Sequence, residues 1–252
     1  MTIDILSHAV ELFSERNGYR PAGLRAALID MDGTLYDSMR WHARAWARMV
    51  ADLGIDFEED EFYAYEGMTG KATINLILSK VGRSKVSDTE AARLYSIKAN
   101  YFAADNKTEI MPGAQEMVRT LCDFGIKPVL VTGSAQSLLL ERLDADFSGA
   151  FDPVKRVTAT NVTHGKPAPE PYLKGLEIAE VKPREAIVIE NAPLGVESGH
   201  RAGIFTIGVN TGPLSIELLR NAGADLVFNS MQEFADFLPE LLLFLKTFPI
   251  DR

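Results

Sequence analysis

Short apolar runs recur at six places along the chain. They lie at residues 26–30, 128–133, 156–161, 186–191, 205–210 and 225–230. Runs of this length are typical of strands that are buried on both faces of a parallel sheet. The pattern therefore predicts a sheet that has helices on both of its sides.

Segments of helical periodicity separate the later runs. They lie at residues 112–125, 134–145, 169–179, 193–203 and 213–223. Strands that alternate with helices indicate right-handed βαβ units. We therefore predict an α/β fold with a doubly wound, Rossmann-like parallel sheet.

The long interval between the first two runs has helical stretches and no convincing strand. We interpret residues 38–107 as an inserted α-helical cap, carried on linkers near residues 37–39 and 108–113 and able to serve as a lid. Residues 24–37 and 108–252 then form the α/β core. Residues 1–23 are an extension, in which the first nineteen residues favour an amphipathic helix docked on the outside.

Composition and charge exclude several classes of protein. The chain of 252 residues is 46% apolar and 24% charged, an ordinary balance for a folded protein. The net charge of −9, without a run of Lys or Arg, argues against nucleic-acid and anionic-membrane partners. The single cysteine, Cys122, excludes an internal disulfide framework. We find no signal peptide and no apolar stretch of about 18 residues, so we expect a cytoplasmic protein. We also expect a monomer.

Polar residues follow four of the apolar runs. In an open parallel sheet, ligands bind at the carboxyl ends of the strands. The residues there are Asp30-Met31-Asp32-Gly33-Thr34, Thr132-Gly133-Ser134, His164-Gly165-Lys166-Pro167 and Glu190-Asn191.

Each of these ends has a chemical and a structural interpretation. Asp30 and Asp32 lie on the same side of the chain, where two carboxylates repel unless a cation such as Mg²⁺ joins them, but they can also form a turn and cap a helix. Thr132 and Ser134 can bind an anion at a helix N-terminus, or Ser134 can be the N-cap alone. Lys166 is either aimed by the following proline or an ordinary solvated charge.

Four ordered motifs carry a resemblance to a known family. D-M-D-G-T-L-Y-D-S, V-T-G-S, G-K-P-x-P-E-P-Y and V-I-E-N-x-x-x-G-V resemble the motifs of the haloacid dehalogenase superfamily, and more narrowly its β-phosphoglucomutase-like subfamily. The resemblance extends from Leu24 to about Ser230, and the subfamily's helical cap is inserted at the place of residues 38–107.

The resemblance implies a role for each motif residue. Asp30 is then the nucleophile that forms an aspartyl-phosphate, and Asp32 is the general acid and base whose backbone carbonyl also binds Mg²⁺. Thr132, the Gly133 amide and Lys166 are expected to hold the oxygens of the phosphoryl group.

The fourth motif departs from the family pattern, which commonly ends in Glu-Asp or Asp-Asp. Asn191 can ligate Mg²⁺ through its amide oxygen but brings no charge, and Glu190 is its neighbour. We hypothesise that Glu66, in the cap loop that matches the family's specificity loop, supplies the missing carboxylate when the cap closes. The predicted metal ligands are Asp30, Asp32, Asn191, Glu190 and Glu66.

The cap loop also bears on the substrate. The sugar-phosphate mutases have an arginine at the position of Gly70, which is followed here by Lys71. Neither residue supplies a bidentate fork, so a mutase is less favoured. Together with Glu66, the loop resembles the inorganic-pyrophosphatase branch. His42 and Lys98 match positions that can face the site, and we predict that they bind substrate with Gly133, Ser134 and Lys71.

The leading hypothesis is a Mg²⁺-dependent phosphohydrolase that acts on inorganic pyrophosphate through an aspartyl-phosphate. The first alternative is a β-phosphoglucomutase or a phosphatase for a small sugar phosphate, with the same use of Asp30. The second is a catalytically weak phosphate-binding or regulatory protein. The four motif residues Asp30, Asp32, Thr132 and Lys166 argue against the second alternative, because binding alone requires no nucleophile.

Overall fold

Six parallel strands form one sheet in the order β3-β2-β1-β4-β5-β6. The structure is a computed structural model, and it describes residues 3–105, 107–134 and 137–248. The strands are β1 (Ala26–Ile29), β2 (Lys127–Val131), β3 (Arg156–Val157), β4 (Ala186–Glu190), β5 (Phe205–Val209) and β6 (Leu226–Phe228). The α/β fold with a parallel sheet is therefore confirmed.

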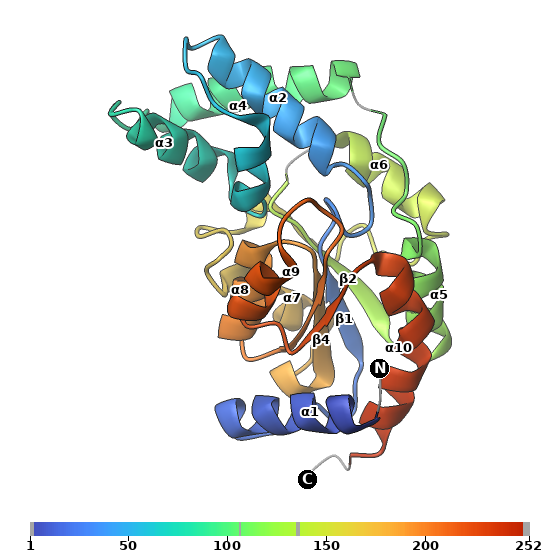
Figure 1. The fold of residues 1–252 in the computed structure, drawn as a ribbon. Helices are drawn as coiled ribbons and strands as arrows, with labels where there is room; N and C mark the ends of the chain where they lie inside the picture. The colour runs from blue at the N-terminus through green and yellow to red at the C-terminus, as the bar shows by residue number, and fades with distance from the viewer. Residues whose placement is uncertain (1–2, 106, 135–136, 249–252) are drawn as a thin grey trace.

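Helices surround this sheet and extend above it (Figure 1). Those of the core are α1 (Ile3–Asn17), α5 (Ala114–Asp123), α6 (Ser137–Asp146), α7 (Glu170–Ala179), α8 (Pro193–Arg201), α9 (Ile216–Asn221) and α10 (Met231–Lys246). Those of the predicted cap are α2 (Met39–Ala51), α3 (Gly70–Lys80) and α4 (Asp88–Asp105). Short 3₁₀ helices are η1 (Glu59–Tyr65), η2 (Ala159–Asn161) and η3 (Pro183–Glu185).

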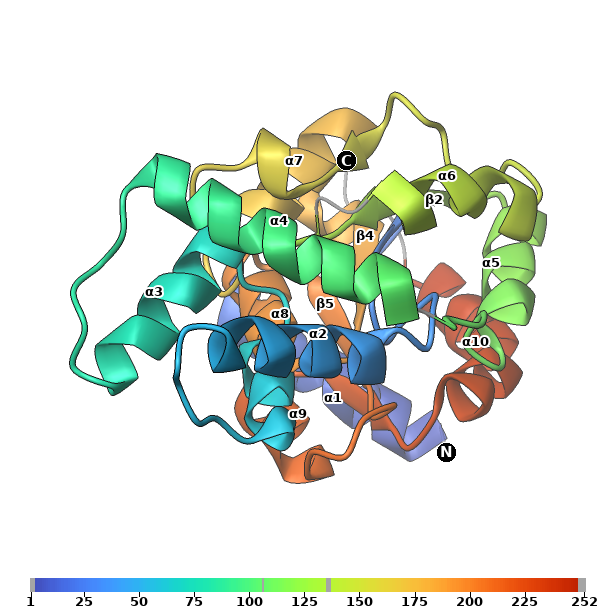
Figure 2. The same cartoon turned by 90° about the horizontal axis from the view of Figure 1, so that it is seen from above.

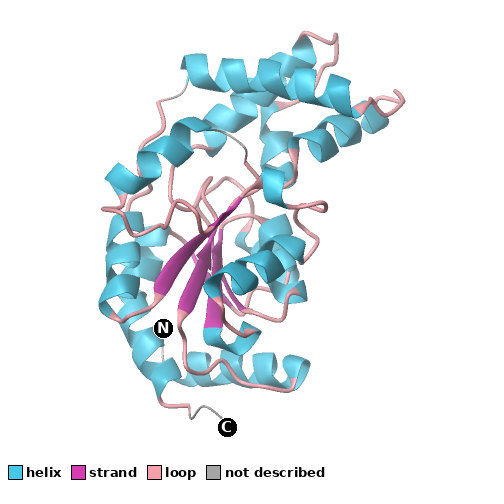
Figure 3. Ribbon diagram, turned by 180° about the vertical axis from the view of Figure 1, so that it is seen from behind, coloured by secondary structure: helices cyan, strands magenta, loops and turns pink. Residues whose placement is uncertain are grey.

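The two faces of the sheet have separate apolar cores. Successive residues of a strand point to opposite faces, so Ala27 and Ile29 pack with α5 and α10, whereas Ala26 and Leu28 pack with α7. The sheet thus lies between two helical layers (Figure 3). This arrangement explains why the runs are apolar throughout and do not alternate.

The helical segment between β1 and α5 has an apolar cluster of its own. Met49, Phe62, Ile77 and Leu94 are among its buried members. Seen from above, α2 and α4 lie side by side across the carboxyl ends of the strands (Figure 2). The separate apolar core of this helical segment supports its interpretation as a cap. The boundaries of the cap at residues 38 and 107 stay a prediction.

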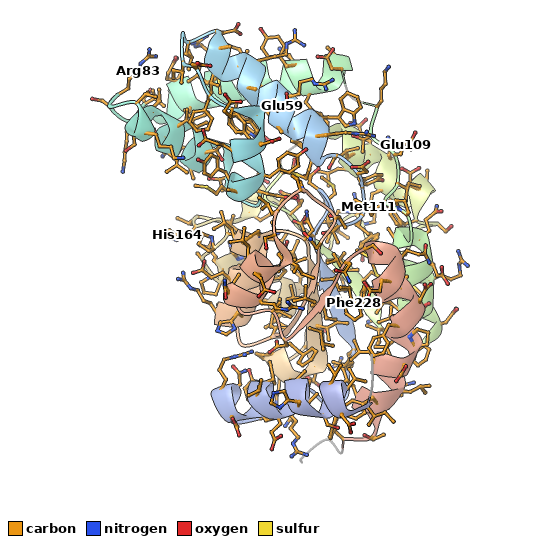
Figure 4. The ribbon with its side chains drawn as sticks, in the orientation of Figure 1. Glu59, Arg83, Glu109, Met111, His164 and Phe228 are labelled. Carbon is orange, nitrogen blue, oxygen red and sulfur yellow. The ribbon has the colours of Figure 1, made fainter. Side chains whose placement is uncertain are left out.

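The two linkers to this segment run against each other. The Asp37 amide donates to the Glu109 carbonyl at 3.0 Å, the Met111 amide donates to the Leu35 carbonyl at 2.9 Å, and Tyr36 forms an antiparallel bridge with Ile110. Figure 4 labels Glu109 and Met111 where the second linker descends toward the core. The two linkers therefore join the core at the same place.

The N-terminal helix α1 docks across the end of the core opposite the cap, as Figure 1 shows. Its buried face includes Leu6, Val10 and Phe13, and the Phe13 ring meets Phe205 edge to face at 5.5 Å. Arg16 donates to the buried carboxylate of Asp225 at 3.0 Å. The predicted amphipathic helix is therefore present and is integrated into the core.

Two details differ from the sequence predictions, and part of one predicted helix cannot be compared. The run at 156–161 is a strand only at its first two residues, because the Asn161 side chain accepts from the Thr158 amide and starts η2. Helix α10 was not predicted. Its signals are the N-cap Ser230, which accepts from the Glu233 amide, and apolar residues at helical spacing around Pro239. Residues 135–136 of the predicted helix 134–145 lie outside the described residues.

No described helix combines the length and the apolar character needed to cross a bilayer.

We expect Phe13→Ala to lower the free energy of unfolding by about 3–5 kcal/mol, because the ring is fully buried and its loss leaves a cavity. Leu12→Ala, on the same helix but 49% exposed, should change it by less than about 0.5 kcal/mol. Urea unfolding of the two variants measures the difference. Equal effects would show that α1 does not contribute to the core as described.

Candidate active site

The ammonium group of Lys166 joins the carboxyl ends of three neighbouring strands. It donates to Oδ1 of Asp30 at 2.5 Å, to Oε1 of Glu190 at 2.6 Å and to the carbonyl oxygen of Val131 at 3.1 Å. Burial alone would lower the pKa of Lys166, but Asp30 and Glu190 raise it above the usual value. The lysine is therefore a buried cation shared by two carboxylates.

Glu190 is held by further donors. Its Oε1 accepts from the Tyr172 hydroxyl at 2.9 Å, and its Oε2 accepts from the amides of Asn191 at 2.9 Å and Ala192 at 3.1 Å. These two amides lead into α8. The carboxylate is thus fully engaged in orienting Lys166 and the loop after β4.

Asp30 lies 5% exposed at the end of β1. Burial raises the pKa of its carboxyl to about 8, since the positive charge of Lys166 only partly opposes burial and the negative charges of Glu190 and Asp32 add to it. An additional cation beside Asp30 would favour the ionised form.

Asp32 has the opposite environment. Its Oδ1 accepts from the Ser38 hydroxyl at 2.6 Å and contacts Nε2 of His42 at 2.9 Å. Burial would raise the pKa of Asp32, but His42, the Ser38 hydrogen bond and the charge of Lys98 together lower it. The two aspartates are therefore held by separate sets of partners.

A chain of contacts continues from His42 into the cap. Nδ1 of His42 lies 2.5 Å from Nζ of Lys98, and the His42 ring stacks on Phe102 with centroids 4.1 Å apart. Lys98 is 2% exposed and lies over the rings of Trp46, Tyr95 and Phe102. The cap thereby places one lysine and one histidine beside the Asp32 carboxylate.

Glu66 and Asn191 meet across the boundary between cap and core. The Asn191 Nδ2 group donates to Oε1 of Glu66 at 2.8 Å, and its Oδ1 accepts from the Thr34 hydroxyl at 3.1 Å. Burial, followed by the charge of Asp30, raises the pKa of Glu66 well above its usual value, although the Asn191 hydrogen bond opposes this. The Glu66 carboxylate of the cap thus lies next to the Asn191 amide of the core. We predicted that Glu66 supplies the negative charge that Asn191 lacks.

Glycines allow the cap loop to descend onto the core. A Cβ added at Gly133 would lie 2.6 Å from the carbonyl oxygen of Gly67, and one added at Gly165 would lie 2.7 Å from Cγ2 of Thr69. Gly67 itself has a φ of +87°, which a glycine adopts without strain. Backbone therefore meets backbone at this seam, and the structure shows the cap closed over the strand ends.

A cavity of about 60 Å³ remains between cap and core. Its core side is polar and includes Asp30, Asp32, Thr132, Gly133 and Ser134, and its cap side includes Glu66 and Lys98. The Thr132 hydroxyl accepts from the Ser134 amide at 3.0 Å. The cavity therefore has the size of a small group and presents several donors and carboxylates to it.

Lys71 does not belong to this site. Its side chain is 55% exposed and pairs with Asp88 on the outer surface of the cap. Lys71 is the second residue of α3, so it points about 100° away from Gly70 around the helix. Its predicted role in substrate binding is therefore not supported by the geometry.

Several contributors were not predicted. Ser38 follows the first motif and donates to Asp32, Tyr172 donates to Glu190, and Trp46 and Tyr95 line the cavity. The motif G-K-P-x-P-E-P-Y ends on Tyr172, which was a usable signal. Trp46 and Tyr95 have no such signal, because aromatic residues at helical spacing ordinarily belong to a core.

The donors present fit a hard cation such as Mg²⁺. In the described part of the chain, no group of three or more His, Cys, Asp or Glu side chains is placed so that it could hold a metal ion by itself. A cation would therefore need the Asn191 amide oxygen and the Asp32 backbone carbonyl in addition to the carboxylates of Asp30 and Glu66. Burial is the main cause of the raised pKa values of Asp30 and Glu66, neighbouring carboxylates add to it, and a cation beside them would favour the ionised forms.

Comparisons with known proteins agree with the fold and the site. Residues 24–203 match the haloacid dehalogenase-like hydrolases. Hexitol phosphatase A of Escherichia coli is 33% identical over 211 residues, which cover 82% of this chain and 91% of that protein. Beta-phosphoglucomutase of Bacillus subtilis is 27% identical over 227 residues, which cover 87% of this chain and 94% of that protein.

A solved structure is similar over almost the whole chain. A Bacteroides vulgatus protein provisionally described as a beta-phosphoglucomutase has a TM-score of 0.93 and 42% identity, and the match covers 97% of this chain and 100% of that one. These relatives support the β-phosphoglucomutase-like part of the resemblance. They are named for sugar or polyol phosphates and lend no support to pyrophosphate.

We expect Lys98 to make stability depend on pH. Burial lowers the pKa of Lys98 to about 7, and Asp32 opposes this shift. The unfolded chain, with a lysine pKa of about 10.4, binds more protons between about pH 7 and pH 10, so stability rises with pH over this range. The free energy of unfolding of the wild type should therefore increase from about pH 7 to pH 9 relative to that of Lys98→Met.

Urea unfolding at the two pH values measures this effect. Lys71→Met removes an exposed lysine from the same cap and should follow the wild type. The same pH dependence in Lys98→Met and in the wild type would contradict the prediction.

Proposed function

Because this chain belongs to the haloacid dehalogenase-like hydrolase family and is a phosphatase of that type, we propose that it hydrolyses a small sugar or polyol phosphate. The relatives named hexitol phosphatase and beta-phosphoglucomutase support this substrate class. The observation that carries the proposal is the pair of aspartates beside one cavity, with Asp30 held by Lys166 and Asp32 held by His42.

The two aspartates divide the chemistry. A carboxylate oxygen of Asp30 attacks phosphorus, and the bond from phosphorus to the leaving oxygen breaks while Asp32 gives that oxygen a proton. Asp32 then takes a proton from the water that attacks the aspartyl-phosphate. Phosphate leaves and Asp30 is regenerated. A substrate phosphate beside Asp32 raises the pKa of that carboxyl, which favours the protonated form that the first step needs.

Other residues hold the phosphoryl group. Thr132 and Gly133 line the cavity beside Asp30, and Lys166, which does not line it, contacts Asp30 from the core; the Thr132 hydroxyl, the Gly133 amide and Lys166 would bind the phosphoryl oxygens. Donors fixed before the reaction stabilise the charge that develops on the phosphoryl oxygens, and loss of one costs about 10²–10³ in rate.

Mg²⁺ would be held by Asp30, the Asp32 carbonyl, Asn191 and Glu66, with Glu190 as a neighbour. When bound, it would neutralise charge on the phosphoryl group. The Asn191 amide presents its nitrogen to Glu66 and its oxygen to Thr34. A half turn of the amide would present the oxygen beside Glu66, and Thr34 could then accept where it now donates.

Pyrophosphate is a second candidate, favoured by two observations in the cap. Gly70 has no side chain to grip a distal phosphate of a sugar bisphosphate. The contact between Glu66 and Asn191 would suit a highly charged substrate that arrives with a cation. The same lack of a cap arginine makes the mutase the weakest enzymatic alternative.

Asp30→Asn should reduce phosphate release by at least about 10⁴-fold while the fold is retained, since an amide cannot form the intermediate. The measurement is phosphate release from sorbitol 6-phosphate, glycerol 3-phosphate, pyrophosphate and nucleotides, with and without Mg²⁺. Turnover of pyrophosphate alone would select the second candidate. Absence of any turnover would favour a phosphate-binding protein, and activity that survives the substitution would exclude the mechanism.

Glu66→Gln should weaken Mg²⁺ binding by about tenfold or more, because it removes one charge close to the cation while it can still accept from Asn191. Titration calorimetry with MgCl₂ measures this without turnover. Glu61→Gln alters a cap glutamate that pairs with Lys80 on the surface and should leave the affinity unchanged. Equal affinities in all three proteins would exclude Glu66 as a ligand.

A further inference from the structure

The side chain of Tyr95, in α4, lies directly against the backbone of Gly70, at the start of α3. A Cβ added at Gly70 would lie 2.6 Å from Cε2 and 3.0 Å from Cγ of the Tyr95 ring, closer than real Cβ atoms approach. Both residues line the cavity. The ring thus occupies the space that a side chain at position 70 would need.

Neighbouring side chains brace the ring. The ring centroids of Tyr95 and Trp46 are 6.0 Å apart, and Nζ of Lys98 lies 5.8 Å from the Tyr95 centroid and 5.2 Å from that of Trp46. Tyr95 is therefore packed on three sides, by Gly70, Trp46 and Lys98. A side chain packed in this way cannot swing aside at low cost.

The cavity changes character from core to cap. At the core end it presents the two aspartates and Thr132, which act on the phosphoryl group. At the cap end it presents Trp46, Phe62, Tyr65 and Tyr95, together with Lys98. A substrate with its phosphorus at Asp30 must extend its leaving group toward this aromatic end.

We propose that Tyr95, seated on Gly70, sets the largest leaving group that the closed site admits. The proposal rests on the proposed phosphatase function and specifies its substrate as one with a short leaving group. A three-carbon polyol phosphate is preferred over a six-carbon one, and the Tyr95 ring is the reason.

The test compares kcat/KM for sorbitol 6-phosphate with kcat/KM for glycerol 3-phosphate. Tyr95→Ala should raise this ratio by about tenfold or more, the usual scale on which a site discriminates by volume. Tyr95→Phe, which keeps the ring, should leave the ratio unchanged. A ratio that is the same in the wild type and in Tyr95→Ala would overturn the proposal.

Gly70→Ala probes the same contact from the other side. The backbone of Gly70 is not in the left-handed region, so alanine adds no backbone strain there, and any loss of stability comes from the Tyr95 ring that the new methyl group must displace. The added methyl group must displace the Tyr95 ring. It should therefore change the ratio of kcat/KM for sorbitol 6-phosphate to kcat/KM for glycerol 3-phosphate. In the Tyr95→Ala background the same substitution should have no effect, because the two residues act through one contact. Additive effects would count against the proposal.

A control separates the size limit from damage to the catalytic groups. Phe102→Leu disturbs Lys98 and His42, which Phe102 contacts, but Phe102 does not line the cavity. It should slow both substrates by the same factor and leave the ratio unchanged. A shift of the ratio as large as that in Tyr95→Ala would assign the effect to Lys98 and overturn the role of the ring.

Binding decides the size limit independently of turnover. Titration calorimetry with the two phosphates on Asp30→Asn and on Asp30→Asn/Tyr95→Ala should show the same change of preference. If the wild type hydrolyses neither phosphate, the proposed function fails, while the binding preference still supports or overturns the size limit.

Discussion

Compensation of buried negative charge at the carboxyl ends of β1, β2 and β4 is the constraint on which the rest of the structure depends. Asp30 and Glu190 converge there away from water, with the half-buried Glu66 nearby, and Lys166 contacts both Asp30 and Glu190. Since an unpaired buried charge is strongly unfavourable, the loop after η2 must carry the lysine from the edge of the sheet to its centre. The Tyr172 hydroxyl and the amides that lead into α8 complete the arrangement. The order of the strands therefore decides which charged side chains meet at the site.

The closed cap increases the strength of these interactions. The cap loop at Gly67 lies against the core loop at Gly133, and burial excludes water from Asp30, Lys166 and Glu190, so a low local dielectric strengthens the ion pairs and hydrogen bonds among them. The same exclusion raises the pKa of Glu66, so a cap that closes without a cation buries an unfavourable carboxylate. Closure of the cap and neutralisation of the Glu66 charge thus favour one another.

The sequence predicted the sheet and the residues at its strand ends, because a short apolar run that stops on polar residues is typical of a strand buried on both faces. The roles predicted for Lys166 and the aspartates came from the resemblance to the haloacid dehalogenase motifs, because the pattern of strand ends alone left other interpretations open. What the sequence did not show depends on contacts between distant segments. The contact between the Tyr95 ring and Gly70 depends on how α3 crosses α4. The outward direction of Lys71 depends on where α3 begins. Helix α10 was missed because Pro239 interrupts a long apolar stretch that fits helix or strand.

The paired linkers have a consequence beyond the motion of the cap. The backbone enters the cap at Asp37 and returns at Glu109 within one hydrogen bond of its departure. An insertion whose ends coincide adds almost nothing to the loop-closure entropy of the core that receives it. Such a segment can be replaced by another one without a change in the fold of the core. The phosphoryl chemistry can remain unchanged in the core while evolution replaces the part that contacts the leaving group, and one scaffold can thereby acquire many substrates.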